Sequence, residues 1–236
     1  MKSSKIVNKQ SQHVVAPEKP TRKAQVRPGP EGGARQQNRK RRIHDLHRAA
    51  LDLFLSRGLA VVTVEDLAAG GGLSKAGFYR YYASIEDLVA ELMAPVRLAI
   101  EEASASAEEG LRAAKKSDQL VVVYMRFGLA LTAVIASHQE IVRLYLQEVR
   151  GPAHGVRRSI VALADEVDAI VLRLTESAQS HGLLRAVDPL VSSQAVLGLM
   201  EHRIYRALRD GRLVQEAERL PALIALVLEG VARQSS

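Results

Sequence analysis

The chain has 236 residues, of which 47% are hydrophobic, and its formal net charge is +7. This length and composition allow one sizeable domain or two small ones with a buried core. The sequence contains no cysteine, which excludes disulfides, thiolate zinc sites and cysteine nucleophiles and favours a reducing compartment. The first residues lack the apolar stretch of a signal peptide, and charges interrupt the longest apolar runs. We therefore expect a cytoplasmic protein without a membrane-spanning helix.

The excess positive charge lies in the N-terminal segment. Residues 1–42 contain twelve Lys and Arg against two acids, a balance of +10, and the remaining 21 basic and 24 acidic residues give −3. Residues 1–38 also hold four of the eight prolines and almost no hydrophobic periodicity, which predicts a disordered basic arm. Such an arm would raise nonspecific affinity for phosphates, and a solubilising tail without contacts is the alternative.

A first amphipathic helix is predicted from residue 39 to the glycine at position 58, which provides a C-terminal stop. Its apolar stripe consists of Ile43, Leu46, Ala50, Leu53 and Phe54. Its basic start consists of Arg39, Lys40, Arg41 and Arg42. These charges would suit contacts with phosphates, and a solvated helix face explains them almost as well.

Residues 63–82, TVEDLAAGGGLSKAGFYRYY, indicate two short helices joined by a glycine-rich turn. Thr63 is a good N-cap, and Asp66 makes an approximate capping box with it. The glycines at 70–72 end the first helix, because glycine adopts left-handed conformations without steric penalty, and Ser74 caps the second helix. This is the helix-turn-helix pattern, in which the start of the second helix faces base edges in the major groove.

The remaining sequence is predicted to be helical to its end. Ser84 caps a helix over residues 84–103, which Pro95 should kink, and residues 104–117 are expected to form a loose helix end and a connector. Further helices are predicted over residues 120–136, 139–149, 155–180, 189–209 and 218–232. The expected fold class is all-α, with a three-helix head, a helical bundle body and a disordered basic arm.

Several short runs of residues resemble one family. They are TVEDLA at 63–68, GLSK at 72–75 and FYRYY at 78–82, and GLLRAVDP at 182–189 precedes the penultimate helix. Through them the sequence resembles the TetR family of bacterial helix-turn-helix transcriptional regulators, most specifically over residues 39–92. The resemblance implies a basic arm at 1–38, a DNA-binding domain at 39–83, and a ligand-binding and dimerisation domain at 84–236 that begins with a connecting helix at 84–103.

The resemblance also implies what the protein does and with what partners. It implies a homodimeric repressor on the bacterial nucleoid that binds a palindromic operator in double-stranded DNA and is released by a small effector, which we expect to be largely apolar. The residues expected to contact DNA are Arg39, Lys40, Arg42, Thr63, Ser74, Lys75, Ala76, Gly77, Phe78, Tyr79, Arg80 and Tyr82. The family commonly has Thr or Ser where Gly77 stands and often has Lys where Ile85 stands, so the basic arm is hypothesised to replace lost phosphate contacts.

Two further sets of residues are expected in the body. The polar residues predicted to line an otherwise apolar pocket are Tyr124, Arg126, Tyr145, Glu148 and His202. Among them Arg126 stands out, because a charge on an apolar helix needs a partner, either Glu148 or an anionic ligand. A four-helix dimer interface is predicted from Val196, Leu197, Met200, Ile204, Leu223, Leu226 and Val227.

Catalysis and metal binding have little support in the sequence. The residues around Ser74 resemble a nucleophile elbow only loosely, because that motif needs a preceding strand and a final glycine. His44 and His47 lie one helical turn apart, but Asp45 points to another face and no thiolate can join them. We therefore expect no enzyme, no metal and no cofactor. The main alternative function is a DNA-binding protein of the same fold that a protein partner controls without an effector.

Overall fold

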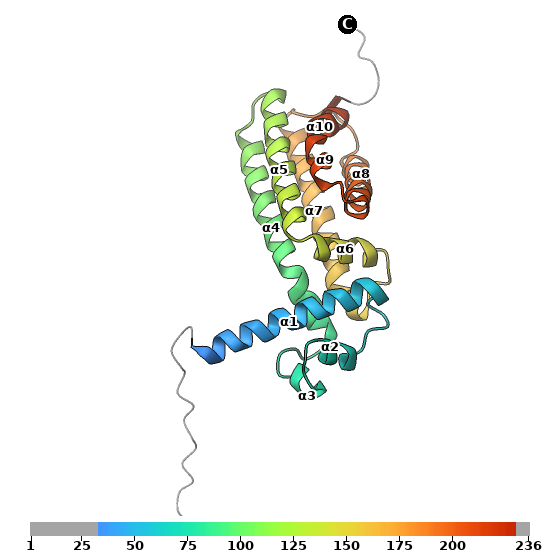
Figure 1. Ribbon diagram of the computed structural model, residues 1–236. Helices are drawn as coiled ribbons and strands as arrows, with labels where there is room; N and C mark the ends of the chain where they lie inside the picture. The colour runs from blue at the N-terminus through green and yellow to red at the C-terminus, as the bar shows by residue number, and fades with distance from the viewer. Residues whose placement is uncertain (1–32, 230–236) are drawn as a thin grey trace, which may run out of the picture.

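The computed structural model describes residues 33–229, which form ten α-helices and one 3₁₀ turn without any strand in that range (Figure 1). The predicted all-α fold class is confirmed. Residues 1–32 of the expected arm, and the last predicted helical residues at 230–232, lie outside the described residues.

Three helices form the head at one end of the molecule: α1 (Ala34–Arg57), α2 (Val64–Gly70) and α3 (Lys75–Phe78). Helix α1 lies across the end of the body, with α2 and α3 below it (Figure 1). The fully buried side chains of Leu46, Phe54, Leu67 and Phe78 join the three helices into one core. Helix α1 starts earlier than predicted, because Gly33 precedes a run of good helix formers, so residues 34–38 are helical and do not belong to the arm.

Seven helices form the body. They are α4 (Ile85–Ala113), α5 (Ser117–Ser137), α6 (Gln139–Glu148), α7 (Arg158–Ser180), α8 (Pro189–Asp210), α9 (Leu213–Glu218) and α10 (Leu220–Glu229), with the 3₁₀ turn η1 (Gly155–Arg157) before α7. Helix α4 runs from the head to the far end of the body and packs against α5 and α7 (Figure 1). Helix α8 packs on α7, and α10 packs on α5.

Helix α4 is longer than predicted. Its buried stripe of Leu88, Leu92 and Val96 passes the exposed Pro95, and the helix continues without a break. Ala107 and Leu111 extend the stripe, which is why residues 104–113 are helical and not a loose connector. The short helix α9 was also missed, and it lies between Gly211, which ends α8 in a left-handed conformation, and α10.

Helix α5 is long and apolar enough to cross a bilayer by length and composition. Its inner face packs against α4, α6 and α10, and its outer face leaves Val122 and Leu129 exposed. The structure therefore uses this helix as one wall of the helical body.

Candidate DNA-binding surface and ligand cavity

The helix-turn-helix forms through the caps that the sequence predicts. The Thr63 hydroxyl oxygen accepts a hydrogen bond from the Asp66 amide at 3.2 Å, and the Asp66 carboxylate accepts one from the Thr63 amide at 3.0 Å. Gly72 in the turn has φ of 65°, a left-handed conformation that favours glycine. The Ser74 hydroxyl oxygen then accepts from the Gly77 amide at 3.1 Å and starts α3.

The predicted recognition helix is shorter than its sequence suggests. Helix α3 ends at Phe78, Tyr79 is its C-cap, and Arg80 lies in the turn that follows, with its amide donating to the Gly77 carbonyl at 3.3 Å. Five of the candidate DNA contacts are exposed on α3 and its ends. They are Ser74, Lys75, Ala76, Tyr79 and Arg80.

Three of the candidate DNA-binding residues are buried and cannot form that surface. Gly77 and Phe78 belong to the core of the head, and Tyr82 is only 5% exposed. The Tyr82 hydroxyl lies 2.6 Å from Nε2 of His47, so it forms a hydrogen bond with α1 and is not available to contact a phosphate. The expectation that Gly77, Phe78 and Tyr82 contact DNA directly therefore disagrees with the structure, because all three residues pack inside the head.

The basic start of α1 contacts the helix-turn-helix. Nη1 of Arg42 donates to the Gly72 carbonyl at 3.2 Å, and the Arg39 guanidinium lies 5.8 Å from the centre of the Tyr81 ring. Both arginines remain exposed, as do Lys40 and the capping residue Thr63. Arg42 thus positions the turn before α3 in addition to offering a charge.

Glu65 is a member of this surface that sequence reasoning missed. Its carboxylate accepts a hydrogen bond from Nζ of Lys75 at 2.6 Å, and both side chains are exposed. This hydrogen bond raises the pKa of Lys75 and lowers that of Glu65. No local pattern indicates the pair, because the two residues lie on different helices. Any phosphate contact of Lys75 must compete with Glu65.

Glu148 lies at the junction of head and body and not in a ligand pocket, which corrects its predicted place. It is 5% exposed, and its carboxylate accepts hydrogen bonds from the Leu59 amide at 3.2 Å and from Nε of Arg157 at 2.7 Å. Leu59 follows α1 and Arg157 precedes α7. Glu148 therefore ties the loop between α1 and α2 to the body.

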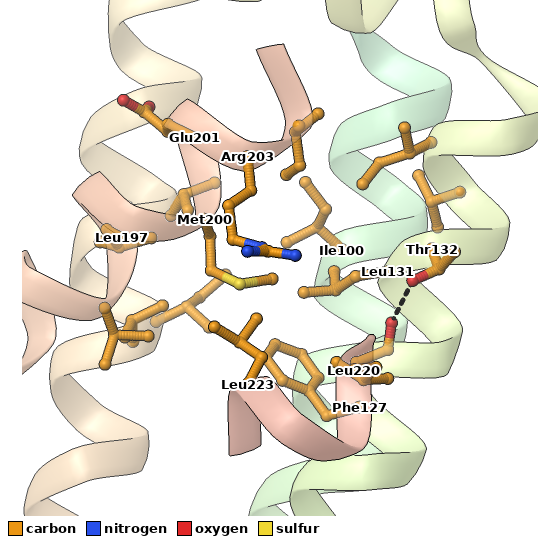
Figure 2. A pocket seen from close by; sticks show the side chains of 18 of the residues that line it. Ile100, Phe127, Leu131, Thr132, Leu197, Met200, Glu201, Arg203, Leu220 and Leu223 are labelled. Atoms are coloured by element: carbon orange, nitrogen blue, oxygen red, sulfur yellow. Dashed lines mark hydrogen bonds between the residues drawn. The ribbon is translucent and has the colours of Figure 1, made fainter. Parts of the chain in front are cut away.

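A cavity of about 300 Å³ lies in the body between α4, α5, α6, α7, α8 and α10 (Figure 2). Its walls are mainly Leu, Ile, Val, Met and Phe, including Ile100, Phe127, Leu131, Met200 and Leu223. A mostly apolar cavity with few polar groups is typical of a small-molecule site.

The cavity contains two of the five predicted pocket residues, Tyr124 and Tyr145. Burial raises the pKa of Tyr124 to about 12. Arg126 is exposed, because α5 turns Tyr124 and Phe127 inward and Arg126 to the opposite side, so its predicted burial and its pairing with Glu148 are wrong. His202 is also exposed, on the outer side of α8.

Two ion pairs lie at the cavity wall. In the first pair, the Glu201 carboxylate accepts a hydrogen bond from Arg150 at 3.1 Å. It also accepts a hydrogen bond from the Tyr145 hydroxyl at 3.2 Å. Arg203 on α8 pairs with Glu216 on α9. Sequence reasoning missed Arg203, although its place between Met200 and Ile204 on an apolar stripe was a usable signal.

The predicted dimer residues divide into two groups. Val196, Leu197, Met200, Ile204 and Leu223 line the cavity of one protomer, whereas Leu226 is 41% exposed and Val227, which also borders the cavity, is 38% exposed. The outer side of α8 instead carries a row of exposed residues with helical spacing, namely Val191, Ala195, Gly198, His202 and Tyr205.

Comparison with known proteins agrees with this arrangement. Residues 46–92 match the family model described as bacterial regulatory proteins, tetR family, and no curated protein matches the sequence. The fold is similar to that of the TetR-family transcriptional regulator PfmR from Thermus thermophilus, with 25% identity, a TM-score of 0.59, and coverage of 80% of this chain and 96% of that chain.

Two further structures are similar in fold. NalD, the secondary repressor of the MexAB-OprM multidrug efflux pump in Pseudomonas aeruginosa, has 18% identity and a TM-score of 0.64 over 84% of this chain and 100% of that chain. FadR from Bacillus subtilis, solved in complex with stearoyl-CoA, has 14% identity and a TM-score of 0.59 over 80% of this chain and 99% of that chain. With the family model matching the helix-turn-helix head and the fold continuing through the helical body, the chain carries a TetR-family DNA-binding domain and has the fold of TetR-family transcriptional regulators.

Proposed function

We propose that this regulator is a homodimeric repressor that binds a palindromic operator and is released by a small, largely apolar molecule. The observation that carries the proposal is the apolar cavity of about 300 Å³ in the body. FadR from Bacillus subtilis, which is similar in fold, was solved in complex with stearoyl-CoA, and this supports an effector with an apolar part.

Helix α6 offers a route from the cavity to the head. Ile141, Val142 and Tyr145 on this helix line the cavity, and α6 also packs against α1. The last residue of α6, Glu148, accepts a hydrogen bond from the Leu59 amide between α1 and α2. A ligand that shifts α6 would therefore shift the head, provided that it binds the two arrangements with different affinity.

DNA contact is assigned to the exposed residues around α3. Lys75 and Arg80 supply charge, and Tyr79 is 50% exposed beside them. Arg39 and Lys40 on α1 extend the positive surface. Charged side chains and a tyrosine hydroxyl are donors that phosphates and guanine edges accept.

The dimer interface is assigned to the outer side of α8 together with exposed residues of α10. Val191 is 60% exposed and Leu226 is 41% exposed, and a Cβ on Gly198 would meet nothing within 4 Å. A second helix can approach closely at such a glycine, and a two-fold axis there would present two heads to one operator. Gly198→Glu should give monomers in analytical ultracentrifugation, whereas Ser106→Glu, at an exposed position on α4, should leave the dimer intact.

The effector proposal is tested by filling the cavity. Leu131→Trp places an indole among residues that line it (Figure 2). The variant should bind operator DNA as the wild type does but resist release by a solvent extract of cells. Equal release of operator DNA by the wild type and the variant would contradict the proposal. If the extract causes neither protein to release DNA, control by a protein partner is favoured.

A further inference from the structure

Arg203 is the one positively charged residue among those described that line the cavity. Its guanidinium points toward the middle of the cavity, near Ile100, Leu131 and Met200 (Figure 2). The Arg203 side chain is 30% exposed, so space remains beside it. A cation in such apolar surroundings is costly unless an anion accompanies it.

Glu216 only partly neutralises Arg203. One oxygen of its carboxylate accepts from Arg203, and the other accepts from Nη1 of Arg219 at 2.8 Å. Two guanidinium groups therefore share one carboxylate, which leaves one positive charge in excess. The guanidinium has five N–H donors, and the ion pair with Glu216 uses only part of them.

The other acid at the cavity wall does not supply the missing charge. The Glu201 carboxylate accepts from Arg150 and from the Tyr145 hydroxyl. It also points away from Arg203 (Figure 2). The excess charge at Arg203 thus remains available to a bound molecule.

We propose that the cavity binds an amphipathic monocarboxylate, with its hydrocarbon body against the apolar walls and its carboxylate on Arg203. This inference rests on the proposed function, because it names the chemical class of the effector. A planar guanidinium matches a carboxylate in a two-bond geometry and holds it more strongly than it holds a neutral hydroxyl. Apolar walls alone would not distinguish the two head groups.

Isothermal titration calorimetry with straight-chain carboxylates and primary alcohols of matched length, from octanoate and octanol to dodecanoate and dodecanol, tests the site. The wild type should bind the carboxylate at least about tenfold more tightly than the alcohol. Arg203→Gln should abolish that preference and leave alcohol binding unchanged. Arg206→Gln is the matched control, because Arg206 lies on the same helix, pairs with Asp210 and does not line the cavity.

A second variant keeps the test sharp if Arg203→Gln folds poorly. Glu216→Gln removes the competing carboxylate and should strengthen carboxylate binding without changing alcohol binding. If Arg203 and Glu216 served only to tie α8 to α9, both variants would lower stability but would leave the preference unchanged. An unchanged preference in both variants would overturn the proposal. Equal affinity of the wild type for both head groups, or no binding of any carboxylate in the series, would overturn it as well.

Release of operator DNA is measured separately on the same proteins. Arg203-dependent carboxylate binding without release would support the anion site and contradict the effector function. Release by alcohols alone, with no effect of Arg203→Gln, would overturn the anion site and support the effector function.

Discussion

Replacing Glu148 by Gln should lower the free energy of unfolding by about 3 kcal/mol, because it removes the buried anion that pairs with the partly buried Arg157 guanidinium. Glu148 is 5% exposed and Arg157 is 20% exposed, and their charged atoms lie 2.7 Å apart. Removing one member of a buried pair costs about 3–5 kcal/mol, and the partial exposure of Arg157 places this case at the lower end. The hydrogen bond to the Leu59 amide is weakened in the same variant.

The measurement is urea denaturation at one fixed protein concentration, because assembly would itself add to the apparent stability. Glu101→Gln is the matched control: Arg97 and Glu101 are also 2.7 Å apart, but they are 42% and 46% exposed. An exposed pair of this kind contributes about 0.5 kcal/mol or less. A loss below about 1 kcal/mol for Glu148→Gln, or equal losses in both variants, would refute the reasoning from burial.

Three further changes have expected outcomes. Glu65→Gln should tighten DNA binding about threefold by freeing Lys75, and in fluorescence anisotropy the effect should vanish in a Lys75→Ala background. Burial lowers the pKa of His47 from 6.5, so the unfolded chain binds that proton more readily and stability should fall as the pH drops below about 6.5. His47→Gln should flatten this dependence in urea denaturation at a series of pH values, and an unchanged pH profile would contradict it. Thr63→Ala should cost about 1 kcal/mol through loss of the cap, measured by thermal unfolding, whereas a neutral result would mean that the capping box contributes little.

The sequence predicts the head well because its signals are local. The caps at Thr63, Ser74 and Ser84 each use a side chain to bind an amide three residues away, so they can be recognised without the rest of the chain. Asp188 with Pro189 marks the start of α8 in the same way. Helix limits without such a cap were less accurate, as at the start of α1 and the end of α4.

The body is predicted less well because its functional residues meet over long distances in the sequence. Arg126 and Arg203 are both charges on apolar helices, and only the packing of neighbouring helices decides that the first faces outward and the second faces the cavity. Glu148 was recognised as important, but its partners Leu59 and Arg157 come from two other segments. Most of the predicted dimer residues line the cavity for the same reason, since the sequence alone does not show whether an apolar stripe faces a cavity or a second chain.

The central claim is that the exposed residues around α3 read a two-fold symmetric DNA site. Selection of bound sequences from a random double-stranded pool tests it most directly. The wild type should enrich two inverted half-sites with a fixed spacing, and Lys75→Ala and Tyr79→Ala should lose that enrichment while their helical circular dichroism is unchanged. Arg112→Ala, at the far end of α4, serves as the control and should enrich the same sites. No enriched sequence with the wild type, or the same enrichment with Lys75→Ala and Tyr79→Ala, would contradict the account.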